Sequence, residues 1–421
     1  MLHKKFFLVL VCISWSICYA QYDAPLYTSY TTEAARARVY DRVVNNIITK
    51  NLAQPLTDST EFVWEDAFNA MQVYDFKNAY THNKMAKAFD SAIYRSVYFQ
   101  RALLEVAYAL YPGEFNVQAQ QILENTTDPK IFAMAAEYLL QSTNSAAERQ
   151  GLLNFLNSKF ADSVFNSPTL FVLKKRLQPV TKNERNASEV LPALLDKNFL
   201  AGATVIYSFQ RKNRDYPGML IIRKSNGEFL RDEAGNIFHI PQLARSITNL
   251  PYYLRNGNTP QGIFRMFGFE VSRNLSIGPT ANVQLGLPVE LSKKKYFGDS
   301  SLTDSTWNLN DYKNLLPASI SNYFPLYEAY YAGLTGRNEI IAHGTTVDPK
   351  LYEGKPYFPF TPTMGCLCTM EIWNGARKKS DQQKLVNGLL AAGSSFGYNV
   401  VFDLDDTNAP VTIGDISRYI K

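Results

Sequence analysis

The sequence predicts a two-domain protein, in which an all-helical N-terminal domain is followed by a mainly β domain with added helices. Apolar residues recur with a helical period as far as about Leu177, whereas from Ala203 onward they gather in short segments rich in β-branched and aromatic residues. The 421 residues also exceed what one ordinary hydrophobic core accommodates. We therefore expect a helical domain at 31–177, a linker at 178–199 and a β-rich domain at 200–421.

The first 20 residues have the pattern of a secretory signal peptide, with two lysines before an apolar run at 6–17 and a polar start after Ala20. We expect cleavage after about Ala20 and export to the periplasm or cell envelope. No later apolar run approaches the roughly 20 residues that a membrane span needs. A lipoprotein signal is the weaker alternative, because Cys18 lacks the small residue expected before it.

Several helices are expected in the first domain. One long helix is predicted to end at Pro112, because one face of it carries Phe89, Ile93, Val97, Leu104 and Tyr111. Asp128 before Pro129 predicts a capped helix start, and further helices are expected around 151–160 and from about Thr169. The pattern fits either a solenoid-like stack or a plain bundle. We find no catalytic constellation in this half, and we expect it to dock the protein to a partner.

The second domain begins with probable strands at 203–210 and 218–224, and Asn226-Gly227 predicts a hairpin turn after them. A turn at 258–264 leads into another strand. Loops and short strands are expected at 273–330, where the run of lysines at 293–295 is taken as a solvated face. The remaining predicted elements are a helix at 381–392, a strand at 398–404 and a short helix at 413–420.

The net charge and the cysteine content narrow the classes of function that the protein can have. A formal net charge of +5 on a chain of this size does not suggest a nucleic-acid partner. Removal of the signal peptide leaves two cysteines, Cys366 and Cys368, which are separated by one residue and cannot form a disulfide framework. We therefore expect the two thiols to have a role other than in a disulfide framework.

One stretch, residues 341–368, combines a histidine with a thiol. His343 is followed by Gly344, and Cys366 is preceded by Gly365. A thiol attacks carbonyl carbon well only as thiolate, so a nucleophilic cysteine usually has an imidazole beside it to take the proton. Glycine lets the backbone approach a substrate and can point N–H groups toward a developing oxyanion. We favour Cys366 over Cys368 as nucleophile, because the glycine precedes only Cys366.

Two metal sites are weaker alternatives. Cys366, Cys368 and His343 could be zinc ligands, but the spacing lacks the usual C-x₂-C. Three carboxylates near the end of the 398–404 strand, Asp403, Asp405 and Asp406, could attract a cation, although solvated turn residues are favoured. We expect neither a metal nor an organic cofactor.

Three motifs follow one another in the second domain: Thr259-Pro260-x-Gly262-x-Phe264, His343-Gly344-Thr345 and Thr363-x-Gly365-Cys366. In this order they resemble the L,D-transpeptidase catalytic domain, a family of enzymes that remodel bacterial peptidoglycan, and the resemblance covers about Leu200–Ile420. It implies a mainly β L,D-transpeptidase-like fold for this half of the chain. The cell wall or a protein partner is then what we expect the helical half to dock to.

The resemblance also implies residue roles. Cys366 looks like the nucleophile and His343 like its base, while Gly344, Thr363 and Gly365 shape the site and the oxyanion hole. Thr345, Met364 and Cys368 are candidates for the substrate groove. The motif at 259–264 looks like a supporting turn. Two positions depart from the family pattern: Met364 stands where a second histidine is usual, and Cys368 where arginine or asparagine is usual.

The function implied is acyl transfer on peptidoglycan stem peptides, through a thioester that an amine acceptor resolves. Hydrolysis of the same thioester would make the protein an L,D-carboxypeptidase. Because of the two departures, a catalytically silent wall-binding or scaffold protein that retains the fold is the alternative.

Overall fold

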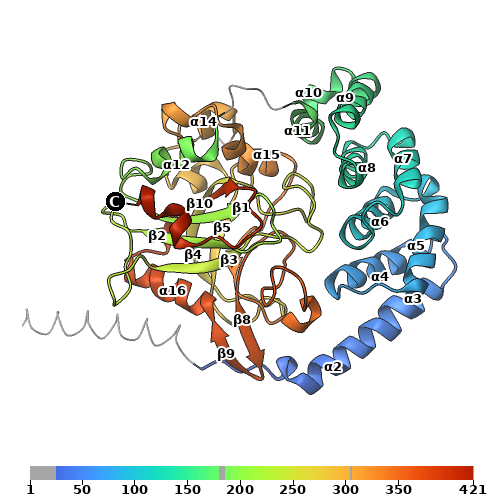
Figure 1. Cartoon of the computed structure of the whole chain (residues 1–421), viewed down its shortest axis with the longest axis horizontal. Coiled ribbons are helices and arrows are strands. Elements are labelled where there is room, and N and C mark those ends of the chain that lie inside the picture. The colour runs from blue at the N-terminus through green and yellow to red at the C-terminus, as the bar shows by residue number, and fades with distance from the viewer. Residues whose placement is uncertain (1–24, 180–184, 304–305, 421) are drawn as a thin grey trace, which may run out of the picture.

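The computed structural model describes residues 25–179, 185–303 and 306–420, and it places a helical N-terminal region beside a closed β-barrel (Figure 1). The expected signal peptide, residues 1–20, lies outside the described residues, as do positions 180–184 of the expected linker. Within the described ranges, no helix combines the length and the apolar character that crossing a membrane requires.

The helical region is a two-row stack. Its helices are α2 (Glu33–Arg42), α3 (Lys50–Ala53), α4 (Glu61–Val73), α5 (Ala79–Ser91), α6 (Val97–Leu110), α7 (Asn116–Asn125), α8 (Pro129–Ser142), α9 (Ala146–Phe160), α10 (Ser163–Asn166) and α11 (Pro168–Leu177), with a π-helical segment, Val43–Thr49, between α2 and α3. Helices α4, α6, α8 and α11 pack in succession as one row, and α5 and α7 pack together in a second. The stack therefore has the solenoid-like order, and Figure 1 shows it following one side of the barrel.

The expected end near Pro112 is confirmed, because α6 ends at Leu110. The segment before it is not one long helix, because the α-helix is interrupted between Ser91 and Val97, which separates α5 from α6. Ser96 caps the second helix, its hydroxyl accepting from the Phe99 N–H at 3.2 Å. The apolar stripe continues across the break, so periodicity alone did not reveal it. The start of α8 is confirmed: the Asp128 carboxylate accepts from the two N–H groups that follow Pro129, at 2.8 and 2.9 Å.

The barrel has the strand order β1-β10-β4-β5-β6-β7-β3-β2. Its strands are β1 (Thr204–Arg211), β2 (Gly218–Arg223), β3 (His239–Leu243), β4 (Gly262–Glu270), β5 (Asn282–Gly286), β6 (Ala342–His343), β7 (Leu367–Thr369) and β10 (Phe396–Asp405), and β8 (Glu371–Asn374) pairs with β9 (Ala376–Ser380) in a separate sheet. The pairs β1–β10 and β6–β7 are parallel and the others antiparallel. Since β6 and β7 are neighbours, His343 and the cysteines are brought to the same part of the barrel.

Six helices accompany the barrel: α12 (Ala187–Leu195), α13 (Lys293–Phe297), α14 (Leu309–Lys313), α15 (Glu328–Leu334), α16 (Asp381–Ala391) and α17 (Ile413–Ile416). Those predicted near 381 and 413 are confirmed. The prediction of loops and short strands at 273–330 is wrong in part. The described residues of this region hold one strand, β5, and more helix than strand. The lysine run lies on α13, where Lys293 is buried with its Nζ 3.3 Å from Asp311.

The second half of the expected linker forms the nine-residue helix α12. Four apolar side chains of α12 are buried, and its Leu194 carbonyl accepts a hydrogen bond from Tyr207 of β1 at 2.8 Å. This segment therefore belongs to the packing of the barrel.

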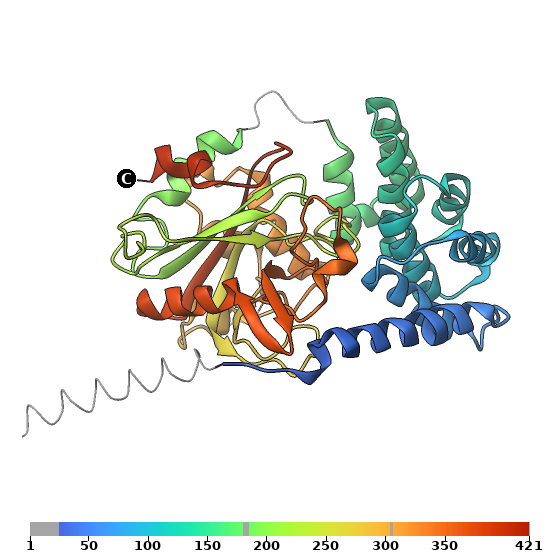
Figure 2. The ribbon, with the colours of Figure 1, turned by 60° about the horizontal axis from the view of Figure 1, so that its bottom comes forward.

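The helical region contacts the barrel side at several separate points (Figure 2). The hydrogen bonds include Arg36 Nη1 to Trp373 O at 3.0 Å, Tyr352 Oη to Val73 O at 2.9 Å, Tyr253 Oη to Glu137 Oε1 at 2.8 Å and Asn256 Nδ2 to Glu105 Oε2 at 3.1 Å. The last two join α6 and α8 to one barrel loop, residues 252–258, which also borders the cysteine.

Candidate functional site

Cys366 stands at the end of a tight turn that leads into β7. Gly365 before it has a φ of +114°, a conformation that glycine adopts without strain. The Thr363 hydroxyl accepts from the Gly365 N–H at 3.1 Å and donates to the Cys366 carbonyl at 2.9 Å. Thr259 donates to the Gly365 carbonyl at 2.9 Å. The turn is therefore held both by its own threonine and by the 259–264 motif, as a supporting role for that motif requires.

The Cys366 thiol is partly buried, and its hydrogen-bond partners among the described residues are backbone groups. Its Sγ accepts from the Ile341 N–H and donates to the Glu339 carbonyl, both at 3.5 Å. Burial raises the pKa of the thiol to about 11, and the Ile341 N–H and the charge of Arg337 partly offset that shift. At neutral pH the resting thiol is therefore protonated.

His343 lies on β6 and pairs in register with Cys368 of β7, not with Cys366. Its side chain is 5 % exposed, and burial lowers its pKa, so the ring is neutral at pH 7. Nδ1 contacts the Gly344 carbonyl, which can only accept, so Nδ1 carries the proton and Nε2 is the basic nitrogen. Among the described residues, no hydrogen bond joins this ring to Cys366.

The glycine and threonine that follow His343 have structural roles. A Cβ on Gly344 would lie 2.3 Å from the buried carboxylate of Glu371. The Thr345 hydroxyl donates to the Ser276 carbonyl and accepts from the Val347 N–H, each at 3.1 Å. Neither residue lines the cavity at Cys366.

The two residues that depart from the family pattern have different environments. Met364 is 49 % exposed and lines the cavity at Cys366. Cys368 is fully buried in a small apolar cluster with Leu243, Tyr352, Tyr357, Phe360 and Met370. Burial raises its pKa to about 12. Cys368 thus fills core space and does not face the cavity.

Arg337 is a site residue that the sequence reasoning missed. Its buried guanidinium donates to the carbonyls of Tyr252, Gly257 and Asn258. Burial lowers its pKa to about 10, which leaves it charged at neutral pH, and its charge lowers the pKa of Cys366. It belongs to no motif, and its acceptors lie about 80 positions earlier in the sequence, so no local signal could have identified it.

The cavity beside Cys366 has a volume of about 430 Å³ and walls from both parts of the chain. The barrel contributes residues 253–256, 335–340, Met364 and Cys366, and the helical region contributes Arg101, Lys130 and Met134. The helical half, in which we expected no part of the site, therefore borders the candidate nucleophile.

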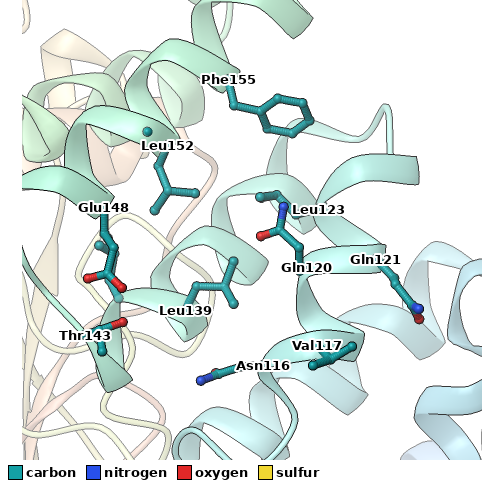
Figure 3. A pocket seen from close by; sticks show the side chains of 12 residues that line it. Asn116, Val117, Gln120, Gln121, Leu123, Leu139, Thr143, Glu148, Leu152 and Phe155 are labelled. Carbon is teal, nitrogen blue, oxygen red and sulfur yellow. The ribbon is translucent and has the colours of Figure 1, made fainter.

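A larger cavity of about 630 Å³ lies within the helical region, between α7, α8 and α9 (Figure 3). Leucines and Phe155 form much of its lining, and it contains no cysteine, histidine or lysine. It is therefore not a candidate catalytic site.

The described residues include no group of three or more His, Cys, Asp or Glu placed to hold a metal ion. Cys366 and Cys368 are both free thiols. Of the carboxylates near the end of β10, Asp403 pairs with Arg214 at 2.5 Å and Asp405 with Arg211 at 2.9 Å. The side chains of Asp403 and Asp405 are therefore engaged in ion pairs.

Comparison with known proteins found no matching family model, no similar curated protein and no similar solved structure.

Proposed function

We propose that the protein is an exported, L,D-transpeptidase-like cysteine acyltransferase that acts on peptidoglycan stem peptides. The observation that carries the proposal is the position of Cys366, whose sulfur borders a two-walled cavity beside a buried arginine. The hydrogen bond from Thr259 to Gly365 adds support, because it gives two of the three sequence motifs a direct physical connection. The third motif supplies β6, the parallel neighbour of the strand that follows the cysteine.

The chemistry begins from a neutral thiol and a neutral imidazole. As Sγ of Cys366 attacks the carbonyl carbon of a stem-peptide bond, its proton passes to Nε2 of His343, which a rotation of either side chain must bring within reach. The C–N bond then breaks, the imidazolium returns the proton to the departing amine, and a thioester remains. The amine of a second stem peptide attacks this thioester and restores the thiol. With water as the acceptor, the same steps give a carboxypeptidase.

The oxyanion of the tetrahedral intermediate needs a donor that is not already engaged. The Gly365 N–H donates to Thr363, whereas the Cys366 N–H has no hydrogen-bond acceptor among the described residues. We therefore assign the oxyanion contact to the Cys366 N–H. A donor of this kind contributes roughly 3–4 kcal/mol in other acyl-transfer enzymes.

The test is acylation of the mature protein by purified tetrapeptide muropeptides, followed by intact mass spectrometry and product analysis. The expected result is an acyl adduct on Cys366 and a cross-linked product when an amine acceptor is present. Cys366→Ala should abolish both, and Cys368→Ala serves as the control that removes one thiol but keeps the nucleophile. A hydrolysed product without cross-links would identify the carboxypeptidase.

A second candidate is a catalytically silent wall-binding scaffold. It is favoured by the missing hydrogen bond between His343 and Cys366 and by the raised pKa of the thiol. Binding of muropeptides with neither adduct nor product would establish this role and refute the acyltransferase.

A further inference from the structure

The wall that the helical region adds to the Cys366 cavity is strongly basic. Four basic side chains line the cavity, namely Arg101, Lys130, Arg255 and Arg337, against the single acidic side chain of Glu339. Two of the four, Arg101 on α6 and Lys130 on α8, come from the helical region. A cavity of one dominant sign attracts ligands of the opposite charge.

Arg101 reaches this wall beside a buried carboxylate. Its Nε is buried and lies 3.6 Å from a carboxylate oxygen of Glu105, so this atom does not face the cavity. That distance permits an ion pair but not a hydrogen bond. The Arg101 side chain is still 27 % exposed, and Lys130 is exposed with no ion pair to its ammonium group among the described residues. An anion in the cavity can therefore contact the exposed part of Arg101 and the ammonium group of Lys130.

The wall is fixed to the loop that supports the candidate nucleophile. Glu105, which faces Arg101, also accepts a hydrogen bond from Asn256 at 3.1 Å. Asn256 belongs to the loop 252–258, whose carbonyls hold the guanidinium of Arg337. A continuous set of contacts thus runs from α6 to the residue beside Cys366, and it sets the position of the basic wall relative to the thiol.

We propose that Arg101 and Lys130 form a carboxylate-binding subsite through which the helical region selects an anionic acyl-donor peptide for Cys366. The inference rests on the proposed function, since it takes Cys366 as the reacting group. Planar carboxylates are the anions that an arginine fork pairs with best, and the lysine adds a point charge at the rim. The helical domain is therefore part of the substrate site.

The test compares alkylation of Cys366 by two small electrophiles, anionic iodoacetate and neutral iodoacetamide. The ratio of the iodoacetate rate to the iodoacetamide rate is independent of the intrinsic reactivity of the thiol, so it reports the charge of the cavity. We expect Arg101→Gln with Lys130→Gln to lower this ratio on the order of tenfold at low ionic strength, with little change in the iodoacetamide rate. The difference should shrink near 1 M salt, where screening acts within about 3 Å.

Two further variants sharpen the test. Lys50→Gln with Lys87→Gln removes the same charge from exposed positions of the helical region outside the cavity, and should leave the ratio unchanged. Lys130→Gln alone tests the wall without disturbing the pair between Arg101 and the buried Glu105. A ratio that is equal in the wild type, Lys130→Gln and the double variant would overturn the subsite.

The outcome is separable from that of the proposed function. A charge-dependent ratio with no acyl transfer to any acceptor would support Arg101 and Lys130 as a carboxylate-binding subsite beside Cys366 but refute the acyltransferase, and with it the role of the subsite in selecting an acyl donor. Normal acyl transfer with a charge-independent ratio would support the acyltransferase and refute the subsite. Failure of both reagents to label Cys366 would overturn both proposals.

Discussion

At Cys366, burial and charge act on the thiol in opposite directions. Burial disfavours the thiolate, while the guanidinium of Arg337 and the Ile341 N–H favour it, and the balance leaves the pKa at about 11. An ion pair between thiolate and imidazolium, preformed in the free protein, is not expected from these contacts. Proton transfer must then accompany substrate binding and attack.

This balance predicts the pH dependence of thiol labelling. The reactive form is the thiolate, so a pKa of about 11 means that the iodoacetamide rate at Cys366 should still be rising at about pH 10, beyond the usual thiol pKa of about 8.5. Peptide mapping by mass spectrometry would locate the label. A plateau near pH 6.5 would instead show that His343 and Cys366 already share a proton in solution.

Arg337 is expected to carry much of the favourable charge at the thiol. Arg337→Met should raise the pKa of Cys366 further and slow its labelling at every pH below the new pKa. It also leaves three carbonyls without their donor, so a loss of stability of about 1–3 kcal/mol per buried group is expected. Arg337→Lys is the matched control, because it keeps the charge. If both variants shift the labelling profile equally, the charge of Arg337 is not what acts on the thiol.

At the scale of elements, the turn before β7 depends on the turn before β4. Thr259 is fully buried, and its hydroxyl donates to the Gly365 carbonyl. Thr259→Val keeps the shape but removes that donor, so we expect a loss of about 1–3 kcal/mol in the free energy of unfolding and a displaced cysteine turn. Chemical denaturation would measure the first effect and the Cys366 labelling rate the second. Thr259→Ser retains the hydroxyl and should recover most of both; equal losses in the two variants would contradict the role of the hydrogen bond.

Elements with local signals were predictable from the sequence. The cap at Asp128, the strand at 398–404 and the helix at 381–392 each depend on residues within a few positions of one another. The break between α5 and α6 was not predictable from periodicity, because the apolar stripe runs through it. The short helices α13 and α14 were missed because they lie in a region rich in Asn, Ser, Gly and Lys, where local patterns are weak.

Some residues of the candidate site were likewise predictable from local sequence motifs, and others were not. Cys366, the turn before it and the supporting Thr259 belong to motifs that can be read in the sequence. Arg337 acts through backbone carbonyls distant in the chain, and Arg101 and Lys130 belong to another part of the fold. Only the folded chain brings these side chains to one cavity, so no spacing in the sequence could indicate them.

For the whole molecule, the carboxylate of Glu137 is one of the contacts that join the helical region to the barrel. Glu137 of α8 pairs with Arg176 of α11 through two hydrogen bonds, at 2.7 and 3.2 Å, and also accepts from the hydroxyl of Tyr253 at 2.8 Å. Burial and the charge of Glu137 raise the pKa of Tyr253 well above its usual value, so this hydroxyl remains a donor at any pH that the protein tolerates. Of these three hydrogen bonds of Glu137, the one from Tyr253 crosses between the two parts of the chain.

Tyr253→Phe should therefore loosen the junction while leaving each part folded. A hydrogen bond to a charged acceptor contributes about 1.5–3 kcal/mol, and the ring still fills its space. We expect faster amide hydrogen exchange in the loop 252–258, together with a weaker dependence of Cys366 alkylation on the charge of the reagent, because the basic wall is less firmly placed. Tyr138→Phe is the matched control: it removes a buried hydroxyl that bonds only within the helical region, to Tyr111 and Phe115, and should destabilise that region without changing exchange in the loop. If the two variants alter the loop equally, the hydrogen bond of Tyr253 to Glu137 does not hold the two parts together, and the position of the basic wall must depend on the remaining contacts.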